Sequence, residues 1–167
     1  MSYWESVIVA VKGDESQVKA LEEIVSRKGT SEELQGFDGH LHYLEFLERL
    51  GFASVKDTLQ MVKQYAAAVE KGEKRQIIEE MKKMARNHIL NQYIELAYEG
   101  RKDGYMAFEA NGVNTYGTLL PDLIEAIKEK FPGLTVLWHR FDEAVFYNCE
   151  GDYNGETNDE KGEYFRY

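Results

Sequence analysis

An α+β fold is predicted for this chain of 167 residues, and two features of the sequence predict it. Residues 119–153 have the pattern of a helix, a tight stop, a strand, a short turn and a second strand. Residues 40–100 keep a helical period, and a shorter strand–helix unit precedes them. A helix packed on a hairpin is half of a two-layer sandwich, so the class is α+β.

The N-terminal unit is predicted from the run Val7–Val11, which is continuous, apolar and β-branched. Such a run is typical of a buried central strand. Asp14 is a suitable helix cap, and Gln17 follows it at the spacing of a capping box. The following helix has the apolar stripe Val18, Leu21, Ile24 and Val25. A strand, a short loop and a helix in this order open a ferredoxin-like or similar α+β fold.

Three helices are predicted in the middle of the chain, after a polar loop. The first follows His40 and stops at Gly51, and the second begins at a capping pattern at Ser54 and ends at Gly72. The third runs over residues 73–99 and has no Gly or Pro before Gly100. No Pro- or Ser-rich linker separates these helices from their flanks. We therefore predict a single domain, 1–167, with a helical insertion at 40–100.

The C-terminal unit begins with a predicted strand at residues 105–110 and a turn signal at Asn111-Gly112. The next helix is ended by Pro132-Gly133. Its apolar face is formed by Leu120, Leu123, Ile124, Ile127 and Phe131. Strands at 134–141 and 144–147 follow, and the aromatic residues 164–167 predict a further edge strand.

One hydrophobic cluster is predicted to hold the strands and helices together. Its members come from the apolar faces of the predicted elements, and they are Val7, Val9, Leu21, Ile124, Ile127 and Val136.

Parts of the chain resemble a ferredoxin-like family of small phage- and plasmid-borne proteins that are usually described as of unknown function. The similar segments are residues 4–28, with Val18-Lys-Ala-Leu21, and residues 105–155, with a helix ending in Phe-Pro, an acidic turn and an aromatic strand leading to Asn-Gly. The resemblance implies the fold and a phage or mobile-element origin, and it implies no catalytic residue. The chain has Asn111–Gly117 where such families often have Trp-Ser-Pro-Pro.

Charge and cysteine content restrict the class of protein. The formal net charge is −10, which opposes binding to nucleic acid or to anionic lipid. The single cysteine, Cys149, cannot form an internal disulfide, which favours a reducing compartment. Because no signal peptide and no apolar run of membrane-spanning length is found, we expect a cytoplasmic protein with no membrane partner.

A partner-binding surface is predicted near the C-terminus. Residues 141–167 carry six of the ten excess negative charges, and aromatic residues alternate with the acids. Rings supply affinity at an interface, and charge speeds encounter with a basic partner. The predicted binding residues are Trp138, His139, Phe141, Asp142, Tyr147, Asp152, Glu156, Asp159 and Glu160. A solubilising acidic loop is the alternative, as is a β-strand at 138–141 that helices cover on both faces.

A metal site is the other hypothesis. His40 and His42 share a face if they lie on a strand, and Glu45, His88 or His139 would have to supply the third ligand. Residues 152–163 have the length of a calcium loop, but Thr157 occupies the position that requires Gly. Cys149 lies beside Glu150 and has no basic neighbour, so it is predicted to be structural rather than nucleophilic.

For function, the sequence therefore leaves two readings open. The first is a non-enzymatic interaction protein of a phage or mobile element, which binds a host protein with a basic surface and needs no cofactor. The second is a small-ligand or metal-binding protein, either an enzyme or not, that uses His40, His42 and nearby carboxylates.

Overall fold

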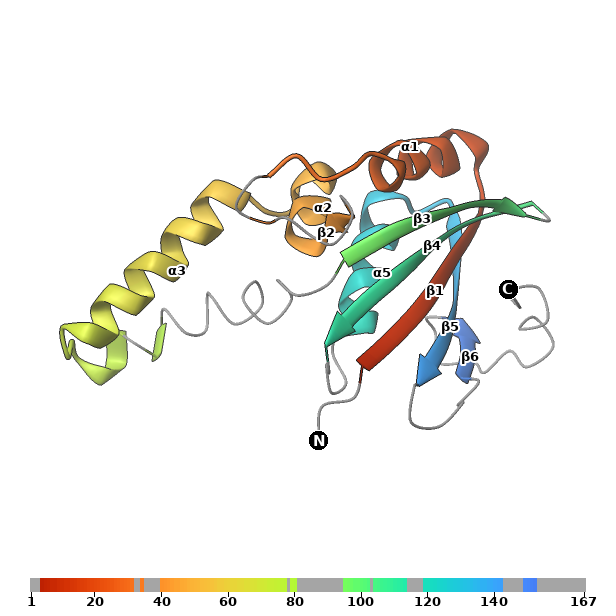
Figure 1. The fold of residues 1–167 in the computed structure, drawn as a ribbon. Coiled ribbons are helices and arrows are strands. Elements are labelled where there is room, and N and C mark those ends of the chain that lie inside the picture. The colour runs from red at the N-terminus through yellow and green to blue at the C-terminus, as the bar shows by residue number, and fades with distance from the viewer. Residues whose placement is uncertain are drawn as a thin grey trace.

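The computed structural model describes residues 4–31, 34, 40–77, 79–80, 95–102, 104–113, 119–142 and 149–152. It is an α+β structure in which helices pack on an antiparallel sheet (Figure 1). The elements in chain order are β1 (Trp4–Gly13), α1 (Glu15–Ser26), β2 (Leu41–His42), α2 (Tyr43–Leu50), α3 (Val55–Glu70), β3 (Glu95–Lys102), β4 (Tyr105–Val113), α5 (Leu119–Lys130), β5 (Leu134–Asp142) and β6 (Cys149–Asp152).

The sheet has six strands in the order β2-β3-β4-β1-β5-β6, and each neighbouring pair is antiparallel. β1 lies between β4 and β5, so the prediction of a central N-terminal strand is confirmed. Val9 is paired with Phe108 on β4 and with Trp138 on β5. Val7, Val9 and Val11 are buried on one face of the sheet and Ile8 and Ala10 on the other, which is why this segment is continuously apolar.

The first loop is joined to the turn between α5 and β5. The side chain of Asp14 accepts a hydrogen bond from the backbone N–H of Gln17 at 3.0 Å, as predicted for a helix cap. The Gln17 side chain does not return to Asp14, as it would in a capping box. Its Oε1 accepts instead from the backbone N–H of Gly133 at 2.8 Å, and the backbone N–H of Asp14 donates to the carbonyl oxygen of Gly133.

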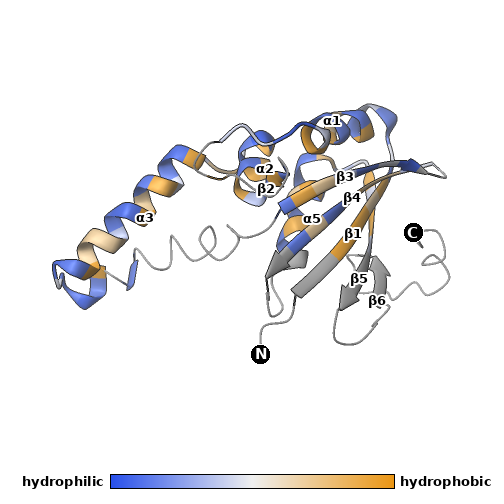
Figure 2. Ribbon diagram, viewed as in Figure 1, coloured by the Kyte–Doolittle hydropathy of each residue, from blue (hydrophilic) through white to orange (hydrophobic). Residues whose placement is uncertain are grey.

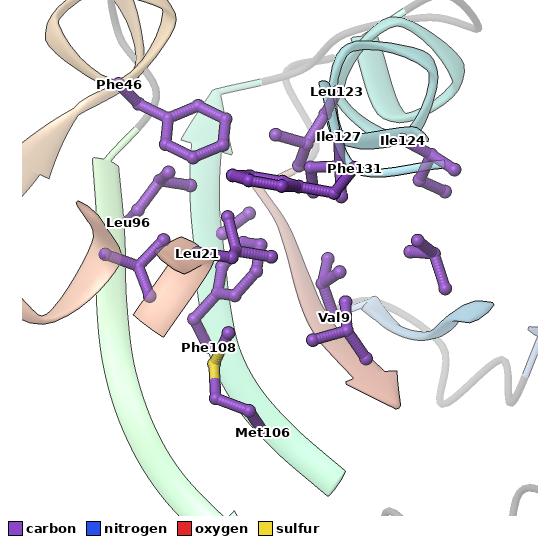
Figure 3. Packing of buried hydrophobic residues seen from close by; sticks show 14 of the residues in the cluster. Val9, Leu21, Phe46, Leu96, Met106, Phe108, Leu123, Ile124, Ile127 and Phe131 are labelled. Atoms are coloured by element: carbon purple, nitrogen blue, oxygen red, sulfur yellow. The ribbon is translucent and has the colours of Figure 1, made fainter. Parts of the chain in front are cut away.

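The main core lies on one face of the sheet, under α1, α2 and α5; we call this the helix face. All six residues predicted for the core belong to this one cluster, so that prediction is confirmed. Figure 3 shows how Phe46 from α2 and Leu123 from α5 approach Leu21 and Phe108 in its centre. The apolar residues of α1 and α5 are turned toward the sheet (Figure 2).

A smaller cluster occupies the opposite face of the sheet. Its members are the residues that alternate with the main core along the strands, and they are Ile8, Ala10, Tyr105, Ala107 and Leu137. Each of them is less than a tenth exposed. The centre of the opposite face is therefore buried and is not an open apolar patch.

α2 ends, and α3 begins, at the residues that the sequence predicts. α2 stops at Gly51, whose φ of 87° lies in the left-handed region, and the Ser54 side chain caps α3 by accepting from the backbone N–H of Asp57. Gly72 follows the end of α3 with a φ of 65°. α3 extends away from the sheet (Figure 1), and polar and apolar residues alternate around it (Figure 2).

Three local assignments need correction. Residues 95–99 were expected to end a helix, but they belong to β3, which pairs with β4 along its length. Leu41 was expected in a helix and lies in β2, and Asn111-Gly112, expected as a turn, continues β4 opposite Ser6 and Glu5. In each case hydrogen bonding to a strand distant in sequence overrides the local preference.

Other predicted elements fall partly outside the described residues. Residues 75–77 and 79–80 are helical, as expected for the start of the third middle helix, but residues 81–94 are not described. The strands predicted at 144–147 and 164–167 also lie outside the described part of the chain. Among the described residues, β5 pairs with β1 on one edge and with β6 on the other.

Candidate functional site

The aromatic surface predicted on β5 is described at Trp138 only. Trp138 is partly buried and packs against the main core on the helix face, opposite Val9. The backbones of His139, Phe141 and Asp142 pair with β1, but their side chains lie outside the described part of the structure. Trp138 thus contributes to packing, and the role predicted for the other three side chains stays a prediction.

Apart from Asp142 on β5, the acidic residues predicted to bind a partner begin at the last described strand. Asp152 ends β6, and its backbone is paired with Leu137 at the outer edge of the sheet. Tyr147, Glu156, Asp159 and Glu160 lie outside the described residues, as does the calcium-loop pattern after Asp152. β6 therefore places the start of the acidic segment at an edge strand.

His42 caps α2 instead of pointing toward a metal. Its Nδ1 accepts a hydrogen bond from the backbone N–H of Leu44 at 3.0 Å, and the residue is 5% exposed. Burial lowers the pKa of His42, although the charges of Glu95 and Glu45 act in the opposite direction. In a neutral ring whose Nδ1 accepts, the proton is on Nε2, so neither nitrogen is left to bind a metal.

His40 contacts a carboxylate that the sequence analysis missed. Its Nδ1 lies 3.4 Å from Oε2 of Glu95, and Glu95 is the direct partner of His42 in the strand pairing. Glu95 was missed because it was assigned to a helix. Among the described residues, no group of three His, Cys, Asp or Glu side chains is arranged to hold a metal ion. His88 and the His139 side chain are outside those residues.

The Glu45 carboxylate is hydrogen bonded to the loop after α1. Oε1 of Glu45 accepts hydrogen bonds from the backbone N–H of Thr30 at 2.8 Å and from the Thr30 hydroxyl at 2.7 Å. Glu45 is only 3% exposed. Burial alone would raise the pKa of Glu45, but the hydrogen bonds from Thr30 and Ser31 and the charge of Arg49 lower it below its usual value. Glu45 is thus an ionised buried carboxylate that holds the loop after α1.

Arg49 joins α2 to the end of α1. Its guanidinium donates to the carbonyl oxygens of Ile24, Arg27 and Lys28 at 2.8–2.9 Å, and it also pairs with Glu45. These carbonyl groups belong to the last turn of α1 and to the two residues that follow it. The last turn of α1 contains no basic residue of its own. An arginine from the next helix therefore provides the cap.

A groove opens beside this joint, between α2 and α3. Its volume is about 650 Å³. The lining residues come from the loop after α1, from α2 and from the first three turns of α3, and they are Thr30, Ser31, Glu45, Glu48, Val55, Lys56, Leu59, Gln60 and Lys63. The groove was not predicted from the sequence, because it depends on the angle between two helices.

Two carboxyl groups meet on the sheet. Glu99 lies at the irregularity of β3 between Tyr98 and Gly100, and its side chain hydrogen bonds to Glu109 on β4. Burial, this hydrogen bond and the repulsion from Glu109 raise the pKa of Glu99. Glu99 therefore binds a proton more readily than an isolated glutamate would.

No family model, curated protein or solved structure matches the chain. Within the described residues, no helix is long and apolar enough to cross a membrane. The function must therefore be argued from the residues themselves.

Proposed function

We propose that the protein is a non-enzymatic interaction protein, which binds a partner protein with a basic surface through its acidic, aromatic-rich C-terminal region. The observation that carries the proposal is the concentration of charge: six of the ten excess negative charges lie in residues 141–167. The position of β6 at the edge of the sheet supports it, since a segment continuing from an edge strand starts at the periphery of the fold.

The charge of described residues also favours a basic partner over an acidic one. Arg49 and Arg101, two of the long cationic side chains, are engaged within the molecule by carbonyl and carboxylate oxygens. The Glu99–Glu109 pair adds concentrated acid on the sheet. An acidic surface that meets a basic one is steered into encounter by long-range attraction.

We further propose that the fold is ferredoxin-like. In that arrangement a βαββαβ chain forms an antiparallel sheet with both helices on one face. The order β1-α1-β3-β4-α5-β5 along the chain, with β3-β4-β1-β5 across the sheet, supports this assignment. β2, α2 and α3 then belong to an insertion between α1 and β3, and β6 is an added edge strand. The phage or mobile-element origin and the host identity of the partner stay predictions.

The test replaces Asp152, Glu156, Asp159 and Glu160 together by Asn or Gln. A partner is first captured from cell lysate, purified, and its association with the wild type measured by surface plasmon resonance at several salt concentrations. We expect the quadruple variant to associate more slowly. Its association rate should also lose most of its dependence on salt, because salt screens the charges that have been removed.

A matched control makes the same change in net charge elsewhere. Glu70, Glu73, Glu79 and Glu80 are exposed on and after α3, and their replacement by Gln also removes four negative charges. The control should associate nearly as fast as the wild type. If the two variants associate at equal rates, or if the C-terminal quadruple variant associates as fast as the wild type, the C-terminal acids only make the protein soluble.

A further inference from the structure

We propose that the groove between α2 and α3 binds a small organic anion with an apolar body, held at its charged end by Lys56 and Lys63. The described residues that line this groove all lie between Thr30 and Lys63, so the proposal goes beyond the protein-binding function. Four observations on the lining of the groove carry it: the position of the lysines, the lack of ion pairs between them and other described residues, the engagement of the carboxylates and the apolar floor.

The lysines are placed to act together. Lys56, Gln60 and Lys63 recur at helical spacing, so they form one row along the exposed side of α3. Lys56 and Lys63 are seven residues apart, which corresponds to about 10 Å along the helix axis. Long, flexible side chains at this separation can converge on a single anionic group or hold the two ends of a dianion.

Neither lysine is neutralised within the part of the chain that the structure describes. No ion pair or hydrogen bond joins the Lys56 or Lys63 side chain to another described residue. In contrast, both terminal nitrogens of Arg49, the arginine beside the groove, donate to the end of α1 or to Glu45. The two lysines thus supply the groove with positive charge that is still available to a ligand.

The carboxylates of the groove are engaged elsewhere. Glu45 accepts from Thr30 and Arg49, and Oε2 of Glu48 accepts from the backbone N–H of Val55 at 2.7 Å. Glu48 therefore serves the N-terminus of α3, and Glu45 serves the loop after α1. Arg49 compensates the charge of Glu45, and Glu48 accepts from the N-terminus of α3, so each acid has a hydrogen-bond donor other than the ammonium groups of the lysines.

The floor of the groove is apolar. Val55 and Leu59 line it, and they belong to a small cluster with Leu34, Leu44 and Ala53 below. A groove of about 650 Å³ is within the usual size for a small-molecule site. An apolar floor with cationic groups at the rim selects ligands that combine a hydrocarbon or ring body with a carboxylate, phosphate or sulfonate group.

The experiment uses 8-anilinonaphthalene-1-sulfonate, a fluorescent anion with an aromatic body. We expect saturable binding to the wild type. The dissociation constant should rise at least tenfold in the variant Lys56→Gln/Lys63→Gln, because both ammonium groups are then missing. Displacement of the probe by inorganic phosphate or by succinate identifies the anionic group that the site prefers.

The control is Lys71→Gln/Lys74→Gln, which removes two exposed lysines beyond the end of α3 and changes the net charge equally. Its dissociation constant should stay within twofold of the wild-type value, and circular dichroism should show both variants folded. The proposal is wrong if the probe does not saturate, if both variants lose affinity equally, or if the loss of Lys56 and Lys63 leaves binding unchanged.

Discussion

His42 illustrates how one buried side chain links stability to pH. The ring is buried, its Nδ1 accepts the first hydrogen bond of α2, and its pKa is lowered by burial. The charged groups that face it are Glu95 on β3 and Glu45 on α2, and they only partly offset the effect of burial. The folded state therefore resists protonation of His42. In the unfolded state the same side chain has the usual pKa of a histidine, about 6.5.

We predict that the free energy of unfolding falls as the pH is lowered through this usual value. The unfolded state binds more protons below it, and one such group gives a slope of up to about 1.4 kcal/mol per pH unit. The variant His42→Asn keeps an acceptor for the Leu44 N–H but does not titrate, so its slope between pH 7 and 5 should be smaller. Urea denaturation at several pH values measures both slopes; equal slopes would contradict the prediction.

Gly13 and Gly51 are two positions at which the structure requires glycine for different reasons. Both have a positive φ, 132° and 87°. A Cβ on Gly51 would meet no atom within 4 Å, whereas a Cβ on Gly13 would lie 2.3 Å from the carbonyl oxygen of Gly133. Gly51 is therefore needed for its backbone conformation alone, and Gly13 also for the close approach of two loops.

We predict that Gly51→Ala lowers the free energy of unfolding by about 1–2 kcal/mol, the usual cost of a left-handed conformation for alanine. Gly13→Ala should cost about 1–3 kcal/mol more, because the backbone of the second loop must move as well. Chemical denaturation of the two variants gives the comparison. A Gly13→Ala variant as stable as Gly51→Ala would mean that the two loops are not tightly joined.

At the scale of elements, α5 has the apolar face that the sequence predicts. Leu123, Ile124 and Ile127 are each at most 1% exposed and belong to the main core (Figure 3). Spacing alone identified this face, because a helix that covers a sheet on one side repeats its buried positions every three or four residues.

Truncating Ile127 tests this packing. We predict that Ile127→Ala lowers the free energy of unfolding by about 2–5 kcal/mol, because it removes buried methyl groups and leaves a cavity. Glu129→Ala, on the exposed side of the same helix, should change it by less than about 0.5 kcal/mol. Denaturant titrations of both variants measure the difference. A loss at Ile127 as small as that at Glu129 would mean that the helix face is assigned wrongly.

β3 shows where local pattern fails. The sequence around residues 95–99 fits a helix, yet this segment pairs with β4 from Glu95 to Lys102. The pairing also creates the Glu99–Glu109 contact and sets Glu95 beside His42. A segment with weak local preference takes the structure in which its backbone groups find partners, and those partners lie on another strand.

At the scale of the whole molecule, the net charge of −10 governs encounters with other macromolecules. We predict no tight binding to duplex DNA, because an excess of carboxylates repels the phosphate backbone and few cations are available to replace its counterions. A mobility-shift assay at about 0.15 M salt should show a dissociation constant no tighter than the micromolar range of nonspecific binders. Nanomolar affinity would contradict the prediction and the proposed basic partner together.

The sequence by itself determined those features that depend on neighbours along the chain. The central strand at Val7–Val11, the caps at Asp14 and Ser54, the stop at Gly51 and the buried face of α5 all follow from spacing and from the conformations that single residues prefer. Each is decided within a few residues, so a reading of the chain in order suffices to find it.

Only the tertiary structure decided which distant residues meet. It places Gln17 against Gly133, Arg49 at the end of α1 and Glu95 beside His42. It also opens the groove beside Lys56 and packs Trp138 against the core. These contacts depend on strand register and on the angles between helices, and many arrangements of the same elements satisfy the local preferences equally well. The packing of the whole chain selects one of them.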